Sequence, residues 1–327
     1  MTIQPSFPSS PARPSETVRL TDTTRGPGVE HSSDSAAWRR VETPQSLHLT
    51  LMRRNRDRLA PGTPLDEWRD DLLRNAQLAL REGQFLERER KAVAERAAQA
   101  PTEATAFAAW FDALRDNGPG QNDPLFDFLA ERATHEQVRW FVQQEVAGEA
   151  GFDDLVALTQ LRLPDRAKLE LARNYWDEMG RGKEHGMHGP MLGRLAEAMG
   201  VEGTDPRVVV WEAIALGNLL AGLAYNRRYA WHSLGALGAV ELTAPTRAVK
   251  VVQALERVGL DGEAVRYFKL HSTIDVVHWQ GWRDNALMPV LAEQPEVARF
   301  IAEGALMRLA AGARTFDRYR REFARSM

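Results

Sequence analysis

The sequence predicts an all-α fold, a bundle of packed helices, and three observations lead to this class. From about Leu47 onward, the helix-favouring residues Ala, Leu, Arg and Glu are abundant. The alternation of apolar and polar residues that marks a half-buried strand is absent over the same range. Short breakers of Gly and Pro divide the chain into segments of helical length. We therefore expect helices packed against one another around an apolar core.

Composition divides the chain into three regions. Residues 1–45 are rich in Pro, Ser, Thr and Gly and hold few large apolar residues, which is typical of a disordered leader. Residues 46–120 are expected to form an N-terminal helical extension, which either packs on the main bundle or serves in dimerisation. Residues 121–327 are expected to form the main bundle.

The expected helices run from one breaker to the next. A long helical segment ends before Pro101, and the turn Asn-Gly-Pro-Gly at 117–120 closes the helix that follows. Later breakers are Gly151, Pro164, Gly200, Pro206, Pro245, Gly259, Gly262 and Pro289. Helices are expected over residues 65–99, 103–117, 134–148, 165–182, 188–199, 206–242 with a break, 246–258, 262–284 and 294–323.

The composition excludes several classes of function. With 42 Lys and Arg against 45 Asp and Glu, the net charge of −3 gives no reason to expect nucleic acid or an anionic membrane as a partner. The chain has no cysteine, which excludes disulfides, zinc–thiolate sites, iron–sulfur clusters and a cysteine nucleophile. Any metal must therefore be held by His, Asp and Glu, the ligands of iron, manganese or catalytic zinc.

The N-terminus lacks the basic and then apolar layout of a signal peptide, and no apolar run approaches the length of a membrane span. We therefore expect a cytoplasmic protein that acts on a small molecule and not on nucleic acid or a membrane. A homodimer is left open.

The sharpest local pattern is His271, Asp275 and His278 in the string LHSTIDVVHWQGW. On one continuous helix these three side chains lie within about 60° of one another. The neighbouring residues Leu270, Ile274, Val277 and Trp279 are apolar, so the polar stripe is expected beside buried positions. Two imidazoles and a carboxylate on one face favour half of a metal site over a solvated stripe.

A second pattern lies in NYWDEMGRGKEHGMHGPML, residues 174–192, which offers Glu178, Glu184 and His188 together with Asp177 and His185. Four glycines interrupt it, and each costs a helix about 1 kcal/mol relative to Ala. A close backbone approach or a bend beside a ligand site is one cause, and a helix end with solvated charges is the other.

Two single carboxylates stand in apolar surroundings. Glu145 follows Trp140, Phe141 and Val142, and Glu241 follows the apolar run LGALGAV. A buried carboxylate needs a metal, a cation or a proton. The alternatives are an exposed face for Glu145, with Glu149 as a rival one turn later, and a helix end for Glu241.

The four pieces fall on four different expected helices, as a metal site in the core of a bundle requires. The charges also balance. Two ferrous ions would offset four carboxylates, and the three histidines would be neutral. The carboxylates are Glu145, Glu178, Glu241 and Asp275.

These residues resemble the ligand pattern of the haem-oxygenase-like diiron oxidases, a family described broadly as iron-containing redox enzymes. The match consists of a first Glu, a Glu and a His ten positions apart, and a Glu thirty positions before a His-x3-Asp-x2-His helix. The matching residues are Glu145, Glu178, His188, Glu241, His271, Asp275 and His278. The resemblance covers roughly residues 105–325 and implies a haem-oxygenase-like seven-helix bundle, with residues 1–104 outside it.

The resemblance also implies an activity: O2-dependent oxidation at two iron ions, Fe(II) or Fe(III), held by these seven residues. O2 would be the co-substrate, and an external electron donor is left open. The size of the chain and its extension make it most similar to family members that N-oxygenate amines in biosynthetic pathways. We therefore expect an amino acid or an amine derived from one as the substrate, free or tethered to a carrier. C–C cleavage, desaturation and oxidative decarboxylation are the alternatives.

The long apolar segment of residues 206–228 carries polar residues that suggest a substrate pocket. These are Asn218, Tyr225 and Arg227, of which Arg227 could pair with a carboxylate. The alternative is a helix end with capping groups and solvated arginines.

Three other functions use parts of the same pattern. A haem-binding oxygenase would need one axial His and would leave the clustered carboxylates without a role. A zinc or manganese hydrolase would use the same ligand types. A helical metal-binding or storage protein is the alternative that is not an enzyme.

Overall fold

The computed structural model describes residues 43–325 apart from residues 65, 202–204 and 206. The predicted disordered leader, residues 1–45, lies outside the described residues except for its last three. Helices make up nearly all of the secondary structure in the described part, beside one isolated antiparallel bridge between Met179 and Met187. The all-α prediction is confirmed, whereas the count of seven core helices and the boundary near residue 120 stay predictions.

The first four helices are α1 (Pro44–Leu59), α2 (Trp68–Ala97), α3 (Ala104–Asn117) and α4 (Pro124–Glu131). All of them except α2 are started by a capping side chain. The Glu103 carboxylate accepts hydrogen bonds from the first backbone N–H groups of α3, and Asp123 does the same for α4. Proline occupies the first position of α1 and α4, where its missing N–H costs nothing. The eight-residue α4 was not predicted from the sequence.

The middle of the chain forms α5 (His135–Gly148), α6 (Phe152–Thr159), α7 (Asp165–Glu178), α8 (His188–Ala198) and α9 (Trp211–Tyr225). A reciprocal capping box of Thr134 and Gln137 starts α5. The predicted helix over 165–182 ends four residues early, at Glu178, and a glycine-rich loop returns the chain to α8. The predicted segment 206–242 breaks after Tyr225, and a single 3-10 turn, Arg227–Tyr229, starts the next helix.

The C-terminal part forms α10 (Ala230–Arg257), α11 (Arg266–His271), α12 (Ile274–Gly281), the π-helix η6 (Trp282–Leu287), α13 (Met288–Glu293) and α14 (Ala298–Arg325). Two predictions need correction here. Pro245 does not end a helix but lies inside α10. The expected helix over 262–284 is interrupted at Ser272 and Thr273, where Thr273 leaves the helical conformation with φ −125°.

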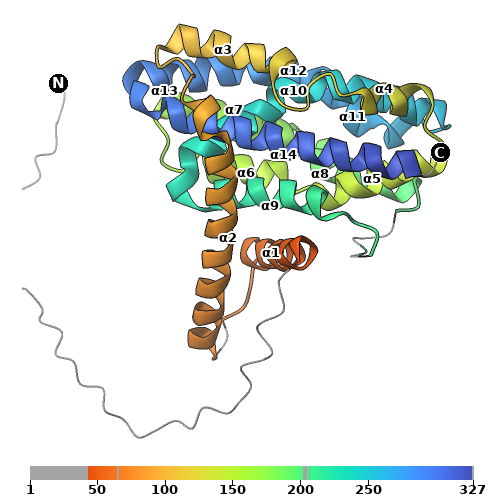
Figure 1. Cartoon of the computed structure of the whole chain (residues 1–327), viewed down its shortest axis with the longest axis horizontal. Helices are drawn as coiled ribbons and strands as arrows, with labels where there is room; N and C mark the ends of the chain where they lie inside the picture. The colour runs from red at the N-terminus through yellow and green to blue at the C-terminus, as the bar shows by residue number, and fades with distance from the viewer. Residues whose placement is uncertain (1–42, 65, 202–204, 206, 326–327) are drawn as a thin grey trace, which may run out of the picture. The chain divides into compact units, whose positions relative to one another are not determined.

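The described helices belong to one compact unit, whose centre is the pair α10 and α14 (Figure 1). Their backbones come very close, because a Cβ on Gly235 would collide with the carbonyl of Ile301 and a Cβ on Gly304 with that of His232. Only glycine allows such an approach at these two positions. α2 runs across α14, and α9 packs against α1 and α5 (Figure 1).

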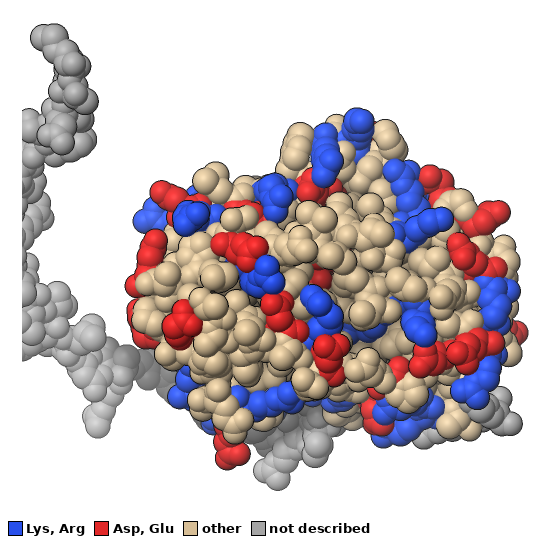
Figure 2. Space-filling model, turned by 90° about the horizontal axis from the view of Figure 1, so that it is seen from above, with Lys and Arg blue, Asp and Glu red and all other residues tan. Residues whose placement is uncertain are grey.

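The surface carries no large patch of one charge on the face shown in Figure 2. Basic and acidic side chains are interspersed there, in keeping with the small net charge. No helix in the described part of the chain combines the length and the apolar character needed to span a membrane.

Candidate metal centre

Two groups of buried ligand-type side chains meet between α7, α8, α10, α11 and α12. One group consists of Glu178, His188 and His271, and the other of Glu178, Glu241 and His278. Within each group the candidate ligand atoms lie within 4.8 Å of one another. Glu178 belongs to both groups, so its carboxylate stands between two adjacent sites.

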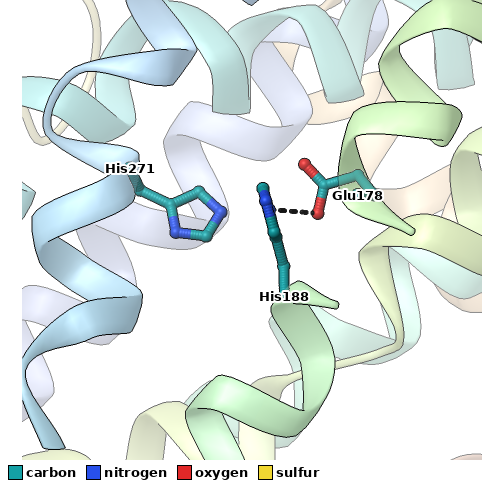
Figure 3. A group of neighbouring side chains, drawn as sticks. All are labelled: Glu178, His188 and His271. Carbon is teal, nitrogen blue, oxygen red and sulfur yellow. Dashed lines mark ion pairs between the residues drawn. The ribbon is translucent and has the colours of Figure 1, made fainter. Parts of the chain in front are cut away.

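The first group is assembled by the glycine-rich loop that follows α7. Glu178 is the last residue of α7 and His188 the first of α8. Gly180 has φ +61°, and a Cβ there would collide with the backbone of Gly186. The glycines therefore permit a tight return that brings His188 Nδ1 to 2.7 Å from Glu178 Oε2 (Figure 3).

His271, the last residue of α11, completes the first group. Its ring meets that of His188 edge to face, with 4.8 Å between the ring centroids (Figure 3). His271 Nδ1 lies 2.7 Å from the carbonyl oxygen of Tyr267. A carbonyl only accepts hydrogen bonds, so Nδ1 carries the proton and Nε2 keeps its lone pair for a metal. Burial lowers the pKa of both His188 and His271 to about 4, so both rings are neutral at pH 7, as a metal-binding imidazole must be.

His278 on α12 belongs to the second group and stands among carboxylates. Its Nδ1 lies 3.4 Å from Glu241 Oε2 and 3.9 Å from Asp275 Oδ1, while its Nε2 lies 3.3 Å from Asp177 Oδ2. Burial by itself would lower the pKa of His278, but Glu241, Glu178 and Asp177 outweigh it and raise that pKa to about 9. A carboxylate behind the outer ring nitrogen is the usual support of a metal-bound histidine.

A second support stands behind Glu241. The buried amide of Asn174 donates from Nδ2 to Glu241 Oε1 at 2.7 Å. Asn174 lies four positions before Glu178, so both project from the same face of α7. Pro245 also affects this residue, because its missing N–H removes the helical hydrogen bond to the carbonyl of Glu241. Sequence reasoning did not single out Asn174, although its spacing from Glu178 was a signal.

Asp275 stands beside both groups without belonging to either. It is 2% exposed, and burial together with the charges of Glu241 and Glu178 raises its pKa well above the usual range. Burial and Glu241 raise the pKa of Glu178 in the same way. Three buried carboxylates so close together repel one another unless protons or cations lie among them.

The donor set fits iron. The buried Nδ1 atoms of His188 and His278 make no hydrogen bond of good geometry, although each faces a carboxylate oxygen, that of Glu178 at 2.7 Å and that of Glu241 at 3.4 Å. Imidazole nitrogens and carboxylate oxygens suit iron, and the shared Glu178 would place two ions next to each other.

The helix that carries His278 is anchored from outside by α3. Asp112 accepts hydrogen bonds from Trp279 Nε1 at 2.7 Å and from Arg283 Nη1 at 3.1 Å. The ring of Phe111 stacks on Trp279, with 4.9 Å between centroids. The π-helix begins at Trp282, immediately after α12, and such π segments are frequent at functional sites.

A cavity of about 210 Å³ reaches both groups. Its wall contains Glu178, His188, Glu241, His271 and Asp275, and much of the remainder is apolar. The apolar wall residues include Phe126, Phe141, Phe152, Leu192, Leu216, Leu220, Val240, Val251, Phe268 and Phe316.

The structure places Glu145 in the same cavity but in neither ligand group. Tyr319 donates a hydrogen bond to Glu145 Oε1 at 3.4 Å, and burial raises the pKa of Glu145 to about 6. The charge of Glu149, also in the cavity wall, contributes to the raised pKa of Glu178. Glu149 is held by the backbone N–H groups of Gly151 and Phe152. Glu145 as a ligand stays a prediction.

None of the three predicted substrate residues lines the cavity. Asn218 is buried between α9 and α1, where it accepts from Asn55 Nδ2 and donates to the carbonyl of His48, both at 2.8 Å. Tyr225 lies under the guanidinium of Arg58, and Arg227 donates to the carbonyl of Leu158 at 2.9 Å. These contacts join the end of α9 and the turn that follows it to α1 and α6.

One protein family, described as iron-containing redox enzyme, has a model that matches residues 139–313. This range contains both ligand groups. No curated protein matches the sequence. Among solved structures, a CADD-like protein of unknown function from Nostoc punctiforme PCC 73102 is similar, with 21% identity and a TM-score of 0.48. That match covers 74% of this chain and 98% of the other.

Proposed function

The chain belongs to the family of iron-containing redox enzymes, and we propose that it is an O2-dependent oxidase or oxygenase with two iron ions. The observation that carries this proposal is the position of Glu178, which belongs to two adjacent groups of nitrogen and oxygen donors. A site for one ion needs no such shared carboxylate, whereas a pair of ions does.

The first ion would be held by Glu178, His188 and His271, and the second by Glu178, Glu241 and His278. Asp275 lies 3.9 Å from His278 and can serve the second ion. When bound, the iron supplies the electrons that activate O2.

The charges of the site favour this occupancy. Glu178, Glu241 and Asp275 supply three negative charges, and two ferrous ions supply four positive ones. A fourth carboxylate would complete the balance, and Glu145 and Glu149 both line the cavity. Glu145 stays the predicted ligand, and the charge of Glu149 acts on Glu178.

For the reaction we propose oxygenation of the nitrogen of an amino acid or of an amine derived from one. Nitrogen must present its lone pair, so the amine has to be neutral. A wall rich in Phe, Leu and Val lowers the pKa of a bound ammonium group by desolvation, which is the required direction. The cavity also holds the nitrogen close to the metal-binding side chains and excludes bulk water from it.

Metal analysis after anaerobic loading with Fe(II) tests the two-ion proposal. We expect close to two ions in the unaltered chain, one in His271→Ala or His278→Ala, and fewer than one in Glu178→Gln. His185→Ala is the matched control, because His185 is exposed and three positions from His188. One ion in the unaltered chain, or a haem absorption band, would contradict the proposal.

The reaction is tested with 18O2 and a panel of amino acids and their amines. N-oxygenation adds labelled oxygen to an intact carbon skeleton. Loss of carbon, or an unlabelled alkene, would favour cleavage, decarboxylation or desaturation instead. Iron binding without O2 uptake on any substrate would favour a storage protein.

A further inference from the structure

Two arginines on the two central helices line the cavity that contains the candidate metal ligands. Arg247 lies on α10, six positions after Glu241, and Arg308 lies on α14. Nothing in the proposed iron centre requires a cation at either place, since the metal ions themselves neutralise the carboxylates. The presence of both arginines in this cavity therefore needs another cause.

The hydrogen-bonding groups of these arginines are largely unused. Arg308 is 7% exposed, and neither its Nε nor its Nη1 has a hydrogen-bond partner. Arg247 donates from Nη2 to Thr243 Oγ1 at 3.0 Å, but its Nη1 has no partner. Burying a guanidinium without partners costs stability, so such groups usually face an anion.

Two carboxylates act on these positive charges, Glu145 on both arginines and Asp275 on Arg247 alone. Glu145 attracts both arginines, while Arg247 and Arg308 repel each other. Burial, followed by the charge of Arg308, lowers the pKa of Arg247 to about 9, and burial lowers that of Arg308 to about 10. Both guanidinium groups thus stay charged at pH 7, and the two carboxylates that act on them, Glu145 and Asp275, are also candidate ligands of the proposed iron centre.

We propose that Arg247 and Arg308 form an anion subsite, and that the substrate is a small organic acid held there through its carboxylate. This inference rests on the proposed function and adds a constraint to it. The planar guanidinium group matches the two oxygens of a carboxylate, which can accept from the unpartnered donors Arg247 Nη1 and Arg308 Nη1.

The position of the subsite also orients the substrate. Six positions of α10 separate Arg247 from Glu241, which corresponds to about 9 Å along a helix. An acid bound by Arg247 and Arg308 can therefore direct its far end toward the metal-binding carboxylates. The oxidised atom then lies several bonds from the carboxylate, while Phe, Leu and Val of the wall surround the carbon chain between them.

Ligand binding to the full chain, with and without iron, tests the subsite. The probes are hexanoate, 6-aminohexanoate and hexylamine, measured by calorimetry and by the shift in melting temperature. The two carboxylates should bind the metal-free chain and raise its melting temperature, whereas hexylamine should not. Arg247→Gln and Arg308→Gln should each weaken carboxylate binding at least about tenfold. Arg321→Gln is the control, because Arg321 also lies on α14 but its side chain is 57% exposed.

The melting temperature without ligand separates a binding role from a structural one. Arg308→Gln removes a buried unpartnered charge and leaves Arg247 to pair with Glu145, so it should melt at the same or a higher temperature. A lower melting temperature in both variants would assign the arginines to stability and overturn the subsite. Failure of both carboxylates to bind, or equal binding in the variants, would also overturn it. Because these measurements do not need iron, a failed iron stoichiometry would contradict only the proposed function.

Discussion

Loading the metal-free protein with Fe(II) should release protons, chiefly from His278. The pKa of this histidine is raised to about 9, so at pH 7 its ring carries two protons. The nitrogen that faces Glu241 and Asp275 must lose its proton before it can bind a metal, while the other stays directed at Asp177. His188 and His271, with a pKa of about 4, have no proton to release at pH 7. About one proton from His278 is therefore expected, together with any held by Glu178 and Asp275, whose pKa values burial and neighbouring carboxylates raise.

The free-energy cost of deprotonating His278 determines how much the affinity for iron is reduced at pH 7. Two pH units separate pH 7 from the pKa of His278, which corresponds to about 2.7 kcal/mol, or roughly a hundredfold in affinity. The affinity for iron should rise at least about tenfold per pH unit between pH 6.5 and 8, because each binding event releases the extra proton of His278. An indicator dye in weakly buffered anaerobic solution counts the protons, and calorimetry gives the affinities.

Asp177→Asn tests the assignment to His278, because it removes one of the carboxylates that raise the pKa of this ring. Proton release at pH 7 should fall in this variant and stay unchanged in Glu184→Gln, an exposed position in the nearby loop. If no protons appear at pH 7, or if affinity does not change between pH 6.5 and 8, the described environment of His278 is wrong.

Three further predictions concern the supports of the site and the fold. Asn174→Ala removes the amide that holds Glu241 and should weaken binding of one iron ion about 10- to 100-fold, with the other ion retained on titration. Asp112→Ala leaves the indole N–H of Trp279 without its acceptor and should lower the free energy of unfolding by about 1–3 kcal/mol in urea. Burial lowers the pKa of His48 from 6.5 to about 4, so its contribution to stability is complete above pH 6.5 and is lost as the pH falls toward 4. The shift of 2.5 units sets an upper bound of about 3.4 kcal/mol, and His48→Gln should flatten the acid side of the stability curve by up to that amount; an unchanged curve would contradict the stated burial.

The sequence predicts the long helices of this protein well because each shows its start and end locally. α2, α3, α5 and α8 fall within a few residues of their expected ranges, and the capping residues Glu103 and Thr134 mark where α3 and α5 begin. The short helices α4 and α6 have eight residues each, too few for a helical repeat to stand out from the surrounding loops. Pro245 misled the prediction because packing between α10 and α14 outweighs the local cost of a proline inside a helix.

The candidate ligands were recognisable because their spacing along the chain is local. Glu178, Glu241 and the histidines meet in the structure, but the sequence could not say which of them share a site. That division depends on the break at Thr273, which no breaker residue announces. The apolar flank was also only half informative, since Trp279 is buried whereas Val277 is 54% exposed. Asn174 and Asp177 lie beside Glu178 in the sequence, but their roles depend on contacts with distant helices, which the sequence does not show. The same is true of the arginine pair.

The break after His271 affects how firmly each of the two proposed iron ions would be retained. His271 ends a six-residue helix and is itself only half-buried, whereas His278 is 2% exposed and its helix is tied to α3. Ageing or mild chelation should therefore strip the ion beside His271 first and leave a protein with a single iron. Such a half-empty protein would keep its shape and much of its metal while losing turnover. Preparations of this protein would then differ in specific activity far more than their purity suggests, and adding back ferrous iron should restore the difference.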